Sequence, residues 1–92
     1  MNRFRDRDTE RFFNGERSRR LPPDIQRRAR TRLRRVIRAT RLSELREPPS
    51  NRLESLHGSR AGQYSIRIND QWRVCFRWTQ SGAIDVEITD YH

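Results

Sequence analysis

The sequence predicts an α+β domain in which N-terminal helices cover one face of an antiparallel sheet. Apolar residues of the first half recur with the 3.6-residue period of a helix, whereas those after Pro48-Pro49 alternate with the two-residue period of a strand. The chain has 92 residues, a length common for one domain, so residues 1–92 are expected to fold as a single unit.

The first half predicts two helices and a short turn. A helix is expected over residues 8–15, capped by Thr9 and ended by Gly15. A longer helix begins at Pro22-Pro23-Asp24, because proline and an acid favour a helix start, and extends to about Thr40. Leucines at 42 and 45 indicate a further short turn before the proline pair. The apolar stripe of the long helix consists of Ile25, Ala29, Leu33, Val36 and Ile37.

The second half predicts three half-buried strands. Asn69-Asp70 and Ser81-Gly82 are compact turn signals, which favour antiparallel hairpins between them. Leu53 and Leu56 indicate an additional, earlier strand. The alternating apolar positions are Tyr64, Ile66 and Ile68, then Trp72, Val74, Phe76 and Trp78, and finally Ile84, Val86 and Ile88.

The face of the sheet away from the helices is expected to be open and polar. The strand alternation assigns to it Arg67, Arg73, Cys75, Arg77 and Glu87. Three arginines on one sheet face either meet an anion or are solvated and paired with acids across the strands. Both interpretations are compatible with the pattern.

The positive charge is concentrated in one segment. All 21 basic residues are arginine, and with 12 acids they give a net charge of +9. Ten arginines and a single acid, Asp24, lie between Arg19 and Arg41, so this segment accounts for the whole excess. Such a field attracts polyanions, which indicates a nucleic-acid or acidic-protein partner. A helix coated by solvated arginines is the alternative.

Several function classes are excluded by what the sequence lacks. A single Cys75 provides neither an intramolecular disulfide nor a cysteine zinc site. There is no membrane-spanning stretch, no apolar signal-peptide region, no metal-ligand spacing and no nucleotide-binding fingerprint. We therefore expect a cytoplasmic chain without membrane contact, metal or cofactor. His57 and His92 are the remaining candidates for proton transfer, and composition and spacing alone leave the activity open.

Three motifs carry a resemblance to a known family. They are Leu-x-Gly-x-Arg-x-Gly-x-x-Ser-Ile-Arg at 56–67, Asn-x-Gln-Trp-Arg-x-x-Phe at 69–76, and Asp-Tyr-His at 90–92. The chain resembles the HigB toxins, the plasmid-maintenance killer-protein branch of the RelE superfamily. The resemblance implies a microbial RNase fold with helices on a curved antiparallel sheet. It also implies a ribosome-dependent endoribonuclease that cuts mRNA in the aminoacyl site.

The resemblance also implies partners and site residues. A HigA-like helix-turn-helix antitoxin would bind the toxin, and operator DNA would be contacted only through that complex. The catalytic residues implied are Arg73, Asp90, Tyr91, His92 and, with less support, His57. Phosphate-binding roles would fall to Arg60, Arg67 and Arg77. Docking on 16S ribosomal RNA would use Arg27, Arg30, Arg34 and Arg38, unless the antitoxin covers them.

Two positions depart from the pattern of the family. Many relatives have lysine in place of His57, and some have histidine where this chain has Glu54. His57 could then be a weaker cation or a second proton-transfer group. The departures keep a second hypothesis open, a non-catalytic or decayed basic RNA-binding module that mainly binds its antitoxin.

Overall fold

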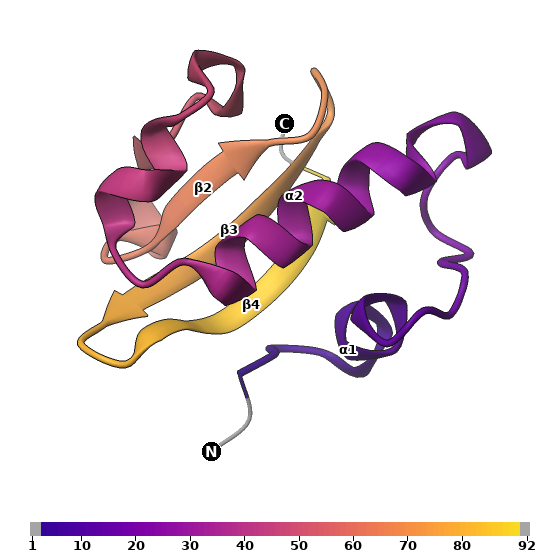
Figure 1. Cartoon of the computed structure of the whole chain (residues 1–92), viewed down its shortest axis with the longest axis horizontal. Helices are drawn as coiled ribbons and strands as arrows, with labels where there is room; N and C mark the ends of the chain where they lie inside the picture. Colours follow the sequence, from indigo (N-terminus) through magenta and orange to yellow (C-terminus); the bar gives the residue numbers. More distant parts are fainter. Residues whose placement is uncertain (1–2, 91–92) are drawn as a thin grey trace.

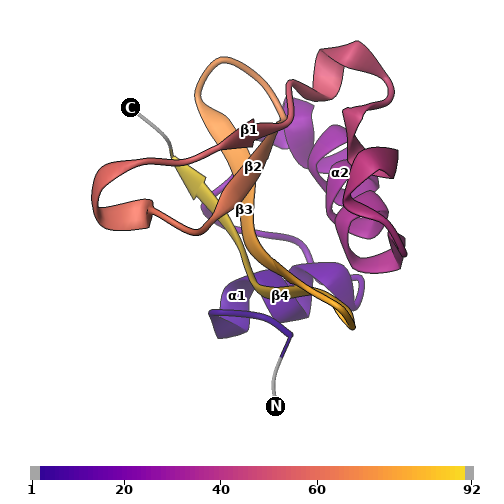
Figure 2. The ribbon, with the colours of Figure 1, turned by 90° about the vertical axis from the view of Figure 1, so that its left-hand side faces the viewer.

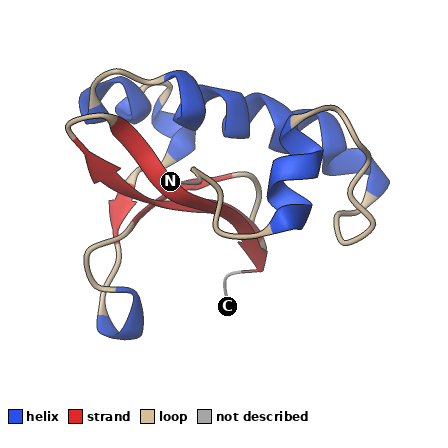
Figure 3. Cartoon of the chain, turned by 90° about the horizontal axis from the view of Figure 1, so that it is seen from below, coloured by secondary structure: helices blue, strands red, loops and turns tan. Residues whose placement is uncertain are grey.

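The computed structural model describes residues 3–90 and has helices on one side of a four-stranded antiparallel sheet with strand order β1-β2-β3-β4 (Figure 1). The α+β fold class and the helices-first order are confirmed. The sheet is strongly twisted when seen from below (Figure 3). In chain order the elements are α1 (Arg7–Phe13), η1 (Pro23–Ile25), α2 (Gln26–Arg38), η2 (Leu42–Arg46), η3 (Pro49–Asn51), β1 (Glu54–Ser55), η4 (Gly58–Arg60), β2 (Tyr64–Arg67), β3 (Trp72–Thr79) and β4 (Gly82–Asp90).

Helix α1 starts at Arg7, one residue before the predicted start at residue 8. Its N-cap is Asp6, whose carboxylate accepts a 2.6 Å hydrogen bond from the backbone N–H of Thr9. The prediction of Thr9 as the cap is wrong because its side chain is buried, where its hydroxyl accepts a bond from the N–H of Ile88. Thr9, the residue expected to cap the helix, therefore links α1 to β4 instead.

Helix α2 provides most of the helical contribution to the core. Ala29, Leu33 and Val36 are completely buried against the sheet, as their spacing predicts, whereas Ile37 is partly buried. The helix ends at Arg38 rather than near Thr40, since Ala39 is extended. The strands contribute the facing apolar residues, with Ile66, Val74 and Phe76 fully buried. The apolar face of α2 and the apolar face of the sheet thus pack together in one core, as both patterns predict.

A β-bulge interrupts the pairing of β3 with β4. Cys75 lies opposite Glu87, whereas Arg77 lies opposite Ile84, so β4 carries one extra residue between these pairs. Asp85 adopts a positive φ of 51° within this interval. Ile84 therefore lies on the same face of the sheet as Arg77. The prediction that Ile84 and Val86 share one face is wrong. A single extra residue is enough to invert the alternation of a strand.

The N-terminal segment, residues 3–5, runs parallel to β4 beside the bulge. Phe4 forms a bridge with Val86, and the two backbone hydrogen bonds measure 2.9 Å from the N–H of Arg5 and 2.8 Å from that of Val86. On the side of the sheet opposite α2 lies the loop between β1 and β2, which contains η4 (Figure 2). The helical side and this outer face are therefore structurally distinct.

Candidate active site

The outer face is built from two adjacent cross-strand rows. Glu54, Ser65, Cys75 and Glu87 form one row across all four strands, and Arg67, Arg73 and Thr89 form the next. Residues paired across antiparallel strands project to the same side of a sheet, so the predicted face assignment of Arg67, Arg73 and Glu87 is confirmed. Cys75 and Ser65 are completely buried beneath the longer side chains. The expectation that this face is open is therefore wrong at its centre.

Arg73 is held firmly on this face. One terminal nitrogen, Nη1, donates a 2.7 Å hydrogen bond to Oγ of the buried Ser65, and it lies 3.5 Å from the carbonyl oxygen of Arg52. The other, Nη2, lies 3.5 Å from a carboxylate oxygen of Glu54. Only 13% of the Arg73 side chain is exposed. The guanidinium is thus held in place by Ser65 on β2, Glu54 on β1 and the backbone of Arg52, and a guanidinium is a planar group that matches phosphate oxygens.

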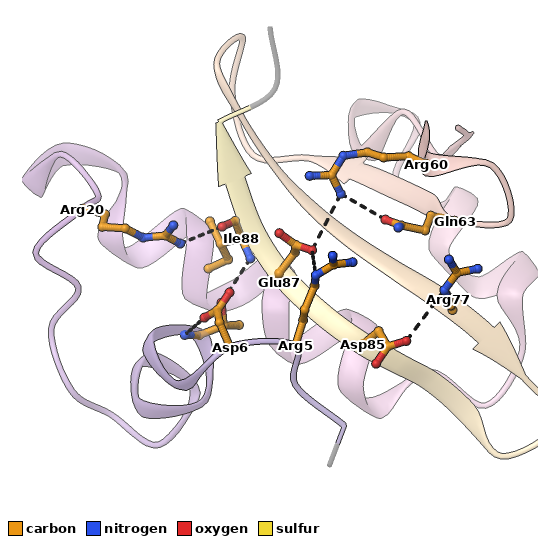
Figure 4. A network of polar contacts seen from close by, with 10 residues as sticks. Arg5, Asp6, Arg20, Arg60, Gln63, Arg77, Asp85, Glu87 and Ile88 are labelled. Carbon is orange, nitrogen blue, oxygen red and sulfur yellow. Dashed lines mark hydrogen bonds and ion pairs between the residues drawn. The ribbon is translucent and has the colours of Figure 1, made fainter. Parts of the chain in front are cut away.

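Arg60 reaches the same face from the excursion that carries η4. Its Nη1 donates a 3.1 Å hydrogen bond to the Gln63 side chain and lies 3.7 Å from Oε2 of Glu87 (Figure 4). Nε of Arg5 lies 3.1 Å from that same oxygen. The oxygen is buried and makes no hydrogen bond of good geometry among residues 3–90, so charge rather than directional bonding joins the three side chains. Glu87 therefore links η4 to the N-terminal segment.

Arg77 and Arg67 flank this centre. Nε of Arg77 lies 3.7 Å from a carboxylate oxygen of Asp85 (Figure 4), and its Nη1 would be 2.8 Å from a Cβ on Gly62. Gly62 also has φ of 92°, so both the conformation and the close approach of Arg77 require glycine there. Arg67 pairs with Asp70 three residues later. All four arginines predicted for this site therefore lie beside an acid.

The remaining predicted catalytic residues are distributed around the face. His57 is exposed and directly precedes η4, in the same excursion as Arg60. Asp90 lies opposite Trp72, one position beyond the Arg73–Thr89 pair, so its side chain starts on the helical side of the sheet. There it accepts a 3.0 Å hydrogen bond from Gln71. Tyr91 and His92 lie outside the described residues.

The helix arginines fall into two groups. Arg27, Arg34 and Arg38 are exposed on α2, the helix that packs on the face of the sheet opposite to that of Arg73. Arg30 instead folds over α1, where its guanidinium lies 4.3 Å from the ring centroid of Phe12 and donates to the carbonyls of Phe12 and Glu16. The structure therefore separates Arg30, which joins the two helices, from the three residues that face solvent.

Charges around the outer face affect its buried thiol. Burial raises the pKa of Cys75 to about 11; the nearby Glu87 adds to the increase, and Arg60 and Arg73 oppose it. The thiol is therefore protonated at neutral pH and behaves as a small apolar side chain. Within residues 3–90 no three His, Cys, Asp or Glu side chains are grouped as metal ligands would be. No helix in this part of the chain is long and apolar enough to cross a membrane.

Sequence reasoning missed several residues of this site. Ser65 stands in the Ser-Ile-Arg motif at 65–67, so its position signalled a role, but not that it orients Arg73. Arg5 gave no signal, because its contact with Glu87 depends on the pairing of the N-terminal segment with β4. Glu54 was noted only as a departure from relatives, although it is the acid beside Arg73.

This combination of a helical layer, a twisted antiparallel sheet and an arginine-bearing outer face is that of the RelE-like toxins of type II toxin–antitoxin systems. Residues 2–92 match the family described as RelE-like toxin of type II toxin-antitoxin system HigB, and the chain belongs to this family. It is also similar to Toxin HigB-1 of Vibrio cholerae serotype O1, with 36% identity over 83 residues, which cover 89% of this chain and 87% of the relative. Membership implies an antitoxin partner, and toxins of this kind are generally endoribonucleases.

Proposed function

We propose that the chain is a ribosome-dependent endoribonuclease that cleaves mRNA in the aminoacyl site, in the cytoplasm and without a metal ion or cofactor. The observation that carries the proposal is Arg73, a guanidinium fixed by the buried Ser65 hydroxyl on the face of the sheet opposite α2. A fixed cation of this geometry stabilises the charge that develops on a phosphate during cleavage. Family membership supports the reaction type.

The proposed reaction needs three kinds of group. A base removes the proton from a ribose 2′-hydroxyl, whose oxygen attacks the adjacent phosphorus. The bond from phosphorus to the 5′-oxygen breaks, an acid protonates that oxygen, and the products are a 2′,3′-cyclic phosphate and a 5′-hydroxyl end. Arg73 and Arg60 would stabilise the pentavalent phosphorus, with Arg67 and Arg77 binding neighbouring phosphates.

Proton transfer is assigned to residues 90–92 and to His57, which precedes η4. His92 would serve as acid or base, Asp90 would orient it, and Tyr91 would stack on a base or donate a proton. His57 would lie near Arg60, where the excursion between β1 and β2 approaches the same face. A histidine there can act as a cation or as a second proton-transfer group.

Docking is proposed for the opposite side of the molecule. Arg27, Arg34 and Arg38 are exposed along α2 and would contact phosphates of 16S ribosomal RNA. A HigA-like helix-turn-helix antitoxin would neutralise the toxin, and operator DNA would be bound only by their complex. The two arginine surfaces would thus serve separate purposes, anchoring on one side and chemistry on the other.

A second candidate is a basic module that binds RNA and its antitoxin without cleavage. The observation in its favour is that Arg60, Arg67, Arg73 and Arg77 each lie within 4 Å of an acid, as on a solvated, ion-paired face. A translation reaction with a defined mRNA separates the candidates. New RNA ends within codons, seen only with translating ribosomes and absent for Arg73→Ala, would support cleavage. Ribosome-bound protein with intact mRNA would support the module.

A further inference from the structure

A cavity of about 520 Å³ lies at the β1 edge of the sheet, between η2, η3 and β2. This volume is within the range of small-molecule sites, roughly 300–1,000 Å³. Its lining combines apolar side chains, one aromatic ring and two cations, without any acid. The lining residues are Leu42, Arg46, Pro49, Arg52, Leu53, Ser55 and Tyr64.

The two cations of this cavity differ from those of the outer face. The guanidinium groups of Arg46 and Arg52 form no hydrogen bond or ion pair within residues 3–90, in contrast to the four acid-paired arginines described above. Both residues are exposed. Arginines that form no ion pair remain available to an anion, and their planar groups suit phosphate oxygens.

The aromatic wall is fixed in place. Tyr64 is half-buried, and its ring stacks on the buried Phe76 with centroids 6.1 Å apart and planes inclined by 26°. Its hydroxyl makes no hydrogen bond to any other residue between 3 and 90. A rigid tyrosine with a free hydroxyl offers both a stacking surface and a polar contact, which is how proteins bind unpaired RNA bases.

The opposite wall is also preorganised. Asn51 is completely buried and donates hydrogen bonds of 3.3 Å and 3.0 Å to the carbonyls of Leu45 and Glu47, which fastens η3 to η2. Arg52 follows with φ of 46°, and its N–H bonds to the Pro49 carbonyl at 3.0 Å. The cavity therefore does not depend on a mobile loop to form.

The cavity and the candidate active site lie on opposite sides of the short edge strand β1, since Ser55 and Tyr64 pair in the row of the buried Phe76 whereas Arg73 is on the outer face. The carbonyl of Arg52 lies 3.5 Å from Nη1 of Arg73, and along β1 Glu54 contacts Arg73 while Ser55 lines the cavity. From these observations we propose that the cavity binds one unpaired nucleotide of the RNA substrate, across the β1 edge from the phosphate held at Arg73. The base would stack on Tyr64 and the phosphate would contact Arg46 and Arg52. This inference rests on the proposed function and adds a position at which the chain selects nucleotides.

The test uses the intact chain and the four nucleoside 5′-monophosphates, followed by NMR shifts of backbone amides. We expect saturable shifts confined to residues 42–55 and 64, with ribose 5-phosphate at least tenfold weaker. Arg46→Gln should weaken binding about tenfold, whereas Arg41→Gln, a nearby exposed arginine outside the cavity, should not. Tyr64→Leu should abolish the difference between nucleotides and ribose phosphate, and Tyr64→Phe should retain it.

Each outcome is decisive. Absence of shifts, or equal binding of ribose phosphate, overturns the nucleotide site, even if the chain cleaves mRNA. Nucleotide binding by the unaltered chain, together with intact mRNA on translating ribosomes, overturns the proposed function instead. In mapped cleavage products, Arg46→Gln should alter the nucleotide preference beside the cut and Arg41→Gln should leave it unchanged. An unaltered preference would show that the cavity takes no part in selection.

Discussion

Arg73 donates to Ser65, a hydroxyl on the neighbouring strand that no solvent reaches, at 2.7 Å. The serine is thus a positioning residue for the cation that we propose stabilises the cleaved phosphate. Its own role is distinct from binding RNA, because it lies beneath the surface. This relationship gives the first prediction.

Ser65→Ala should slow mRNA cleavage without abolishing it. A hydrogen bond to a charged group contributes about 1.5 kcal/mol or more, which corresponds to roughly a tenfold lower rate. Arg73→Ala should abolish detectable cleavage, and Ser65→Thr should retain most activity if its hydroxyl keeps the bond. The measurement is the rate of appearance of cut mRNA at saturating ribosome concentration. An equal loss for Ser65→Ala and Arg73→Ala would contradict a purely positioning role.

The exposed helix arginines should control the salt dependence of ribosome binding. Replacing Arg27, Arg34 and Arg38 by glutamine should reduce the slope of log affinity against log salt, by about 0.7–0.9 for each phosphate that is no longer neutralised. Arg30→Gln is the matched control. It should leave the slope unchanged but lower the free energy of unfolding by about 1 kcal/mol, since Arg30 joins α1 to α2. Sedimentation with ribosomes across a salt series measures the slopes, and identical slopes for all variants would refute the docking role.

Asp6→Ala should destabilise the chain by about 1 kcal/mol, because it removes the side chain that caps α1. Asp8→Ala removes an acid from the same turn without touching the cap, so its effect should be smaller. Urea unfolding followed by circular dichroism measures both. A larger loss for Asp8→Ala would mean that charge near the helix start, rather than the cap bond, determines the stability of α1.

The buried thiol should weaken the fold at alkaline pH. Folding raises the pKa of Cys75 to about 11, so its contribution to stability is complete below the ordinary thiol pKa near 8.5. Between about pH 9 and pH 11 the thiol is ionised in the unfolded state but still protonated in the folded state. The free energy of unfolding therefore decreases as the pH rises through this range. Urea midpoints measured across this range should fall less steeply for Cys75→Ala. Equal slopes for the two proteins would show that other groups cause the alkaline loss.

The repeating patterns predicted the elements well because burial alone determines them. Leu33 and Val36 on α2, and Val74 and Phe76 on β3, lie in the core where their periods place them. Two details of these elements could not be predicted from the repeating patterns. The extra residue near Asp85 inverts the face of Ile84, and Asp6 competes with Thr9 for the cap. Both outcomes are decided by contacts with distant strands.

The candidate site was predictable in its residue types but not in its contacts. Alternation along β2 and β3 placed Arg67 and Arg73 on the outer face, and the structure confirms that face. Which acid accompanies each arginine depends on register and on the path of residues 57–63, as with Arg60 beside Glu87. The cavity at Tyr64 requires η2, η3 and β1 to meet, and no pattern in the sequence signals that meeting.

The pairing of Phe4 with Val86 has a consequence for the synthesis of the protein. Arg3 bonds to Ala83, eighty residues later, and α1 fastens to β4 through Thr9, so these contacts of the N-terminal segment cannot form until β4 has been made. The sheet and its N-terminal cover can therefore be completed only after β4 has been synthesised. A nascent chain would therefore leave residues 3–5 without their strand partner until the codons of β4 have been translated.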